Sequence, residues 1–307
     1  MRSSREKNYE ARIGTADHQV YQRKIGKATW QGDSLAGKTL LVWREQGIGD
    51  DIRFASCYPD LAARAQAEGG KLIIETEPRL ITLYARSFPT ATIRSAGEPL
   101  PDDTIHFDIP AGSLPGLLRN SISDFPAENA FLKPKESRIE KLRAEIEALG
   151  AGLKVGISWR SRNMESSRSR FYTDLSDWKA LFNRPDIQLI NLQYGNVDKE
   201  IEAANTMNAN IHVVDGLDLM NDLDGAAALS RAVDVVISAG TSVGDMAGAV
   251  GATTYIYGAH RHPMCLGTQK FPWYPSVTWI GHQWNEPLTK SVDKIVGLIE
   301  HEVGQRG

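Results

Sequence analysis

Residues 41–54 of the chain read LVWREQGIGDDIRF, an apolar run followed by two glycines and two adjacent acids. The apolar run predicts a buried β-strand, and the apolar spacing after the acids predicts a helix. Gly47 and Gly49 allow a tight turn between the two and leave room for a ligand. The stretch therefore predicts a strand–turn–helix unit, from which parallel α/β sheets are built.

The alternation of strand and helix continues along the chain. In the first half, strands are predicted at 38–43, 71–76, 91–95 and 105–112, and helices at 50–70 and 78–89. After a charged amphipathic helix at 135–149, strands are predicted at 153–159, 187–195, 233–240 and 252–258, and helices at 174–183, 221–232, 241–251 and 290–303. This order predicts the α/β class, with two Rossmann-like parallel-sheet domains that face each other across a cleft.

Four segments follow from this pattern. Residues 1–36 are polar and are predicted to be a leader or linker, with Trp30 as an anchor on the main body. Residues 37–134 and 135–289 form the two predicted domains, and 290–307 form a closing helix. Ligands of open parallel sheets bind at the carboxyl ends of the strands, so the cleft is the expected site.

Composition excludes several classes of protein. The formal net charge is -3 with basic residues spread along the chain, which argues against non-specific nucleic-acid binding. No apolar run approaches the roughly 20 residues of a membrane helix, and the N-terminus lacks the apolar stretch of a secretory signal. The chain has 2 cysteines, Cys57 and Cys265, far apart in the sequence. They do not make a disulfide framework, so we expect a cytoplasmic protein.

The acids that follow the glycine turn have two interpretations. Asp50 or Asp51 can serve as the N-cap or first-turn acid of the helix, where it interacts favourably with the helix dipole. Alternatively, one carboxylate faces the cleft as a general base that takes a proton from a hydroxyl. The stretch is neither a dinucleotide fingerprint, since the third glycine is missing, nor a P-loop, since no Gly-Lys-Ser/Thr follows.

A second candidate region is GISWRSRNMESSRSRFYTDLSDW (156–178), in which a strand with Ser158 and Trp159 at its end leads into an arginine-rich loop. Arginine is suited to bidentate pairing with phosphate oxygens, and Arg160 sits directly at the strand end. Arg162, Arg168 and Arg170 are equally consistent with a solvated loop. Gln193 and Tyr194, at the end of another strand, can contact a base or ribose, or serve in the core and a turn.

A third candidate region is VVISAGTSVGDMAGAVG (235–251), where a buried strand ends in small residues before a helix that begins at Thr241 or Ser242. Such a helix N-terminus exposes backbone N–H groups and binds phosphate readily. The alternative is a plain N-cap with small residues for close packing of the helix on the sheet.

Other features carry less weight. The sequence HRHPMC (260–265) is a single short cluster without further ligands, so no metal site is predicted. Asp222 and Asp224 resemble a metal-binding pair but lie at the start of a predicted helix, so helix capping is expected. The aromatic, proline-rich stretch at 271–279 is predicted to be a packed crossover loop or part of the cleft lining.

Several motifs in order resemble a known family. They are W-x-G-x-x-L-x-G-K-T-L-L-V-W-x-E-Q-G-I-G-D (30–50), PRLITLYARSFP (78–89), PAGSLPGLLR (110–119), KVGISWR (154–160), LINLQYG (189–195), DLDGAAALSRAVDVVIS (222–238), AGAVG (247–251) and PWYPSV (272–277). Together they resemble the glycosyltransferase domain found behind tetratricopeptide repeats in bacterial proteins. That domain is akin to the family 9 lipopolysaccharide heptosyltransferases, and the resemblance covers about residues 30–300.

The resemblance implies a GT-B architecture in which the first domain binds mainly the acceptor and the second mainly a nucleotide-diphosphate sugar. It implies inversion at the anomeric carbon with no essential metal and no cofactor, on a glycan or protein acceptor. Asp50, rather than Asp51, matches the proposed general base. Arg160, Thr241, Ser242 and Val243 match the donor diphosphate site, together with the N–H of Gly244.

The chain departs from the family where Asp245 stands in place of a histidine, and where the last strand ends in Ser238, Ala239 and Gly240. The tetratricopeptide repeats are not seen in this sequence. These departures favour a second hypothesis, a catalytically degenerate module that binds a glycan or protein. A GT-B epimerase and a nicotinamide-dependent oxidoreductase are further alternatives, the latter weakened by the missing third glycine.

Overall fold

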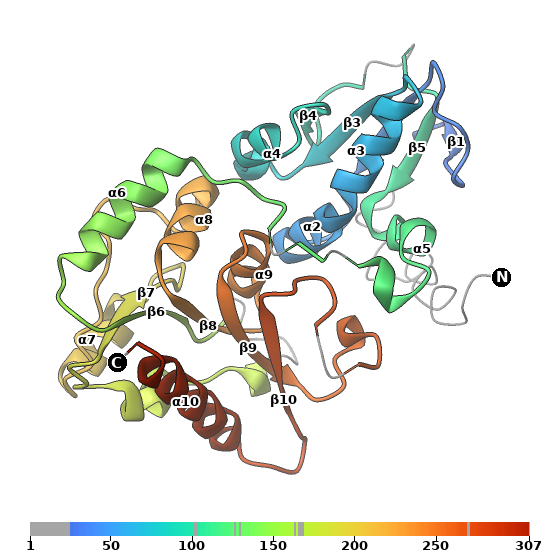
Figure 1. Ribbon diagram of the computed structural model, residues 1–307. Helices are drawn as coiled ribbons and strands as arrows, with labels where there is room; N and C mark the ends of the chain where they lie inside the picture. Colours follow the sequence, from blue (N-terminus) through green and yellow to red (C-terminus); the bar gives the residue numbers. More distant parts are fainter. Residues whose placement is uncertain are drawn as a thin grey trace. The chain divides into compact units, whose positions relative to one another are not determined.

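The computed structural model describes residues 25–100, 104–125, 127–128, 130–162, 164, 169–268 and 271–306. The chain divides into two compact units, which meet in sequence between Ala127 and Glu128. Each unit is built on one five-stranded parallel sheet with helices packed against it (Figure 1). The predicted α/β class with two Rossmann-like sheets is thereby confirmed. Arg168 and the part of the predicted leader before residue 25 lie outside the described residues.

The sheet of the first unit has the strand order β1-β5-β2-β3-β4, and each pair of neighbours is parallel. The central strand β2 is buried at every position, as expected for a strand covered on both faces. Trp30, beside β1, is fully buried. The strands are β1 (Ala28–Thr29), β2 (Thr39–Trp43), β3 (Lys71–Thr76), β4 (Thr92–Ser95) and β5 (Phe107–Pro110).

The helix predicted at 50–70 is divided into three pieces, α2 (Ile48–Phe54), the 3-10 turn η3 (Ala55–Cys57) and α3 (Tyr58–Ala67). Pro59 has no N–H to donate to the carbonyl of Ala55, so the α-helical ladder is interrupted there. The other helical segments of this unit are η4 (Pro78–Leu80), α4 (Ile81–Ser87), η5 (Ala111–Ser113), α5 (Pro115–Leu118) and η6 (Ile122–Asp124).

The sheet of the second unit has the order β10-β9-β8-β6-β7, again with parallel neighbours throughout. The strands are β6 (Leu153–Ser158), β7 (Ile187–Asn191), β8 (Val235–Ala239), β9 (Thr253–Ala259) and β10 (Val277–His282). The prediction of a crossover loop at 271–279 is wrong for residues 277–279, because β10 begins at Val277 and pairs with β9. As an edge strand, β10 is only partly buried: Val277, Ile280 and His282 are buried, whereas Thr278 is exposed and the other two residues are intermediate.

The α-helices of the second unit are α6 (Glu136–Glu147), α7 (Asp198–Asn205), α8 (Leu223–Ala232), α9 (Ser242–Ala249) and α10 (Thr289–Gly304). Short 3-10 segments are η7 (Ser169–Phe171), η8 (Leu175–Leu181) and η9 (Pro263–Cys265). The predicted helix at 174–183 is therefore a 3-10 segment, kinked at Trp178. Asp222 caps α8 by accepting a hydrogen bond from the backbone N–H of Gly225 at 2.9 Å, which confirms the expected capping role.

Among the residues that the structure describes, no helix has the length and apolarity that crossing a bilayer requires.

Candidate functional site

The β2–α2 turn places the two acids in the first turn of α2. Gly47 is the N-cap in an extended conformation (φ -69, ψ 172), and its backbone carbonyl accepts from the N–H of Asp51 at 2.9 Å. A Cβ at Gly47 would meet no protein atom within 4 Å, so space is left beside the turn. Gly49 lies within α2, directly before Asp50. The acids are thus at the carboxyl end of a parallel strand, where ligands of such sheets bind.

The two acids have different environments. The side chain of Asp50 is 29% exposed and pairs with Arg53 at 2.9 Å. The side chain of Asp51 is fully buried and accepts hydrogen bonds from Thr76 Oγ1 at 3.0 Å, from the N–H of Glu77 at 3.1 Å and from the hydroxyl of Tyr84 at 3.3 Å. Asp51 is therefore engaged inside the fold, whereas the Asp50 carboxylate reaches solvent.

The buried position of Asp51 changes its titration. Burial raises the pKa of Asp51 to about 6, although the positive charge of Arg44 and the hydrogen bonds to the carboxylate oppose this shift. The Arg44 Nε atom lies 3.5 Å from the Asp51 Oδ2 atom. Asp51 thus carries its negative charge at neutral pH in a site that disfavours it.

In the second unit, the predicted donor residues follow the carboxyl ends of three strands. Because all strands of this sheet are parallel, Ser158, Asn191 and Ala239 end β6, β7 and β8 at the same edge. The structure therefore brings the loops that carry Arg160, Gln193 and Thr241 to one edge of the sheet.

Gln193 organises the loop after β6. Its Oε1 atom accepts hydrogen bonds from Ser158 Oγ, from the N–H of Trp159 and from the N–H of Arg160, each at 3.0 Å. Its Nε2 atom donates to the carbonyl of Tyr194 at 3.1 Å, and its side chain is buried. Of the two interpretations of Gln193, the geometry favours a structural role, with the amide fixing where Arg160 leaves the strand.

Arg160 is held by an acid that the sequence did not single out. Its Nε atom donates to Glu200 Oε2 at 3.0 Å, and a second guanidinium nitrogen bonds the other carboxylate oxygen. The indole N–H of the fully buried Trp159 donates to the same Oε2 atom at 2.7 Å. Partial burial alone would raise the pKa of Glu200, but the hydrogen bonds from Arg160 and Trp159 outweigh it and lower the pKa.

Glu200 lies on α7, an eight-residue helix that sequence reasoning missed. The apolar periodicity that would indicate this helix in the sequence is weak, because α7 buries only Ile201 and Ala204.

The N-terminus of α9 has no side-chain cap. Thr241 is the N-cap (φ -128, ψ 176), and its own N–H donates to the carbonyl of Ala239 at 2.6 Å. Ser242 and Val243, which begin the helix, are partly exposed. A Cβ at Gly244 would lie 2.7 Å from Ile256 Cδ1, so this glycine is required by close packing of α9 on β9. Uncapped N–H groups at a helix N-terminus are suited to an anion.

Asp245 points into the fold. The residue is 4% exposed, and its carboxylate accepts a hydrogen bond from the hydroxyl of Tyr274 at 3.0 Å. Tyr274 stacks on Phe131, and both residues belong to the second unit. Asp245 is thus bound by a buried tyrosine of the segment before β10.

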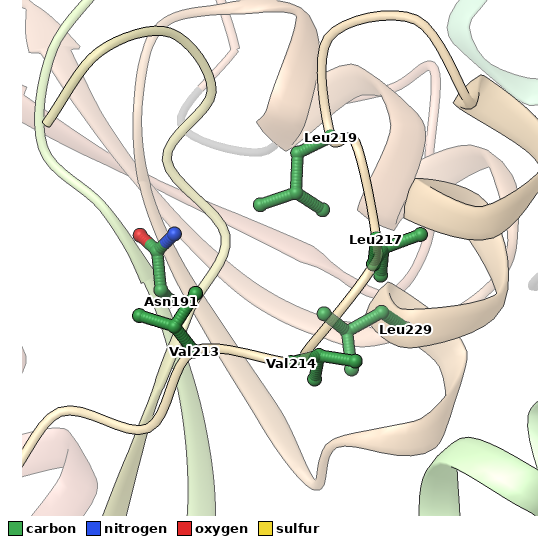
Figure 2. A pocket seen from close by; sticks show the side chains of 6 residues that line it. All are labelled: Asn191, Val213, Val214, Leu217, Leu219 and Leu229. Atoms are coloured by element: carbon green, nitrogen blue, oxygen red, sulfur yellow. The ribbon is translucent and has the colours of Figure 1, made fainter. Parts of the chain in front are cut away.

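Figure 2 shows a small pocket of the second unit, between the end of β7 and α8. The amide of Asn191 lies on one side and leucine side chains lie on the other. Its lining residues are Asn191, Val213, Val214, Leu217, Leu219 and Leu229. Sequence reasoning assigned nothing to the segment 213–219, which has no strand or helix periodicity of its own.

The remaining candidates are dispersed. Arg170 stacks on Phe171 and on Trp284, with 4.9 and 4.4 Å from the guanidinium carbon to the ring centroids, and Trp284 is 75% exposed. Tyr194 lies near Ser161, with 3.4 Å between the two hydroxyl oxygens. Within the described ranges, no group of three or more His, Cys, Asp or Glu side chains is arranged to hold a metal ion.

No family model matches the sequence. The chain is 35% identical over 283 residues to Protein FlbA of Caulobacter vibrioides, a match that covers 88% of this chain and 47% of that protein. The chain therefore spans about half the length of this curated relative.

Several solved structures are similar to this chain in fold, although their sequences have little identity with it. E. coli ADP-heptose lps heptosyltransferase II superposes with a TM-score of 0.60 at 11% identity, over 86% of this chain and 99% of that one. A glycosyl transferase family 9 protein from Veillonella parvula gives a TM-score of 0.60 at 10% identity, over 90% of this chain and 99% of that one. Similarity at this level of identity shows the fold alone. The chain therefore has the GT-B fold of the family 9 heptosyltransferases.

Proposed function

We propose that the chain is an inverting glycosyltransferase that moves a sugar from a nucleotide-diphosphate donor to a hydroxyl of a glycan or protein. The observation that carries this proposal is that the two acids of α2 have different environments. The carboxylate of Asp51 is buried and hydrogen-bonded inside the fold, whereas Asp50 has a partly exposed carboxylate at the carboxyl end of β2. The GT-B fold supports it, since heptosyltransferases with this fold use ADP-heptose according to their names.

In the proposed reaction, Asp50 accepts the proton of the acceptor hydroxyl as the oxygen attacks the anomeric carbon. The bond from that carbon to the donor phosphate breaks, and the nucleoside diphosphate leaves with its electron pair. Attack opposite to the leaving group inverts the anomeric carbon. In this scheme the carboxylate acts on the acceptor, so its negative charge does not oppose donor binding.

The leaving diphosphate is proposed to bind at the uncapped N-terminus of α9, through the N–H groups from Ser242 to Gly244. Arg160 is the cation proposed to pair with it. A phosphate that binds Arg160 must compete with Glu200, which already holds the guanidinium in two places.

The test is to incubate the chain with a panel of nucleotide-diphosphate sugars and with glycan or protein acceptors, and to assign the product by NMR. The proposal expects calorimetric binding of at least one donor, and a product whose anomeric configuration is opposite to that of the donor. It also expects unchanged transfer after treatment with EDTA. A product with retained configuration would contradict the mechanism.

The alternative, a degenerate GT-B module that binds a glycan or protein, is favoured by the Arg160–Glu200 pair, because it occupies the cation expected to bind phosphate. The same calorimetry separates the two hypotheses. Binding of a glycan or protein without binding of any nucleotide sugar would favour the module.

A further inference from the structure

The buried neighbour of the proposed base has no assigned role. We infer that Asp51 is a positioning residue for transfer, whose carboxylate fixes the first turn of α2 against the end of β3 and so fixes Asp50. This inference rests on the proposed function and extends it to a residue that does not touch a substrate.

Asp51 connects three elements that are distant in sequence. Thr76 is the last residue of β3, Glu77 follows it, and Tyr84 lies on α4. All three donate to the two oxygens of the Asp51 carboxylate. An acid with three donors from two neighbouring elements has one permitted orientation. The first turn of α2, which Asp51 shares with Asp50, is therefore tied to the adjacent strand.

Arg44 extends this attachment to the loop before the helix. One guanidinium nitrogen donates to the carbonyl of Gln46 at 2.8 Å, and another donates to Glu77 Oε2 at 2.7 Å. The Nε atom of Arg44 faces Asp51. The loop that leads to Gly47 and the first turn of α2 are thus held by one connected set of charges.

The other groups near Asp51 do not replace it. Burial, then the charge of Asp51, hold the pKa of Tyr58 well above its usual range, so its hydroxyl stays neutral. That hydroxyl is buried without a hydrogen-bond partner among the described residues. Glu77 is engaged with both Arg44 and Arg79. Asp51 is therefore the group through which α2 is attached to this network.

A charged carboxylate at this site is not the choice that stability alone would favour, because a neutral side chain of the same size avoids the desolvation of a charge. Proteins retain such groups where precise placement matters, since displacement of a reacting group by about 1 Å can slow catalysis about 100-fold. The contacts of Asp51 are suited to this purpose, because they hold the turn without occupying the exposed side of Asp50.

The experiment compares Asp51→Asn with Glu75→Gln. Glu75 lies directly before Thr76 on β3, is fully buried, and pairs with Arg94 at 3.0 Å. The control thus removes an equally buried charge from the strand that carries Thr76, at a side chain that pairs with Arg94. For each folded variant, kcat and KM are measured, together with amide hydrogen exchange of residues 50–52.

We expect Asp51→Asn to lower kcat about 10- to 100-fold with KM changed less than about twofold, because the base is displaced while the substrates still bind. Exchange at residues 50–52 rises at least about tenfold in this variant, as local opening becomes easier. Glu75→Gln changes neither quantity in the folded protein. If Asp51→Asn does not fold, Tyr84→Phe removes one donor to Asp51 and gives the same changes on a smaller scale.

Wild-type kcat in the folded Asp51→Asn variant overturns the inference, whether or not exchange changes. A fall in kcat without faster exchange also overturns it, because the turn would then be equally well held. Absence of any transfer by the wild-type chain, or full transfer by Asp50→Asn, contradicts the proposed function instead. The exchange rates then decide by themselves whether Asp51 holds the turn.

Discussion

The β2–α2 turn of the first unit and the β8–α9 turn of the second have the same plan. Each helix starts without a side-chain cap, from an N-cap residue in an extended conformation. Each has a buried aspartate as its fourth residue, Asp51 in α2 and Asp245 in α9. They differ at the third residue, where α2 has Asp50 and α9 has Gly244.

The residue at this third position determines which groups of the turn can contact a ligand. Asp50 adds a carboxylate that reaches solvent, whereas Gly244 adds no side chain and packs against Ile256. The first turn is therefore suited to accept a proton, and the second to receive an anion on its N–H groups. In both turns the buried aspartate accepts a hydrogen bond from a tyrosine hydroxyl, that of Tyr84 in the first and that of Tyr274 in the second.

The largest expected effect on stability concerns the buried acid of the first turn. The pKa of Asp51 is about 6 in the folded chain and 3.8 when unperturbed. A raised folded-state pKa means that the folded chain holds this proton more tightly, so the stability contributed by protonated Asp51 is lost as the pH rises through 6.

Relative to Asp51→Asn, we expect the free energy of unfolding of the wild type to fall by about 2 kcal/mol between about pH 4 and pH 7. Urea unfolding of both proteins across this range measures it, and the difference removes the other titrating groups. A wild type that gains stability relative to the variant as the pH rises would show that ionised Asp51 stabilises the fold.

The next effect tests the close packing of α9, the helix that follows the second turn. A Cβ at Gly248 would lie 2.6 Å from Tyr274 Cγ and 2.8 Å from Val277 Cγ2. We expect Gly248→Ala to lower the free energy of unfolding by about 1–3 kcal/mol through overpacking. The matched control is Gly297→Ala on α10, where a Cβ meets nothing within 4 Å and helix propensity predicts a gain of up to about 1 kcal/mol. Equal effects of the two changes would contradict this account of α9.

Removing the hydroxyl of Tyr274 tests whether Asp245 stabilises the fold or contributes to donor binding. Tyr274→Phe removes the hydroxyl that donates to the Asp245 carboxylate at 3.0 Å and is expected to destabilise the chain by about 1–3 kcal/mol. Donor affinity, measured by calorimetry on the folded variant, should change less than about twofold. A large change in donor affinity with unchanged stability would instead place Asp245 in the donor site.

The smallest effect concerns the ion pair beside the second turn. Glu200→Gln removes the charge that holds Arg160, and we expect donor diphosphate to bind about 2- to 10-fold more tightly. Glu202→Gln, two residues further on the same helix and exposed, is the control and should leave the affinity unchanged. Weaker binding in Glu200→Gln would show that the pair orients Arg160 for the donor rather than competing with it.

Much of the fold follows from the sequence, because the apolar runs that form β2, β6 and β8 are buried on both faces and are bounded by turns. The edge strand β10 does not, because only half of its residues are buried and its signal is lost among aromatic residues and prolines. The division of the helix at 50–70 was readable in retrospect from Pro59.

The places of the candidate residues in the fold were predictable from the sequence, but their contacts were not. Glycine turns and strand ends indicated where Asp50, Arg160 and Thr241 would lie. Which of the two acids is buried depends on Thr76 and Tyr84, which are 25 and 33 residues away from Asp51 in sequence. The partner of Arg160 lies 40 residues away on a helix with little apolar signal. Such pairings are set by tertiary packing, which local patterns do not encode.

The central claim is that Asp50 takes the proton of the acceptor hydroxyl, and transfer by Asp50→Asn at saturating donor and acceptor tests it most directly. Asp60→Asn is the matched control, because Asp60 is also a first-turn acid, in α3, and pairs with Arg119. We expect Asp50→Asn to bind donor as the wild type does and to lose about 100- to 10,000-fold in kcat, while Asp60→Asn keeps its activity. Wild-type turnover by Asp50→Asn would contradict the claim.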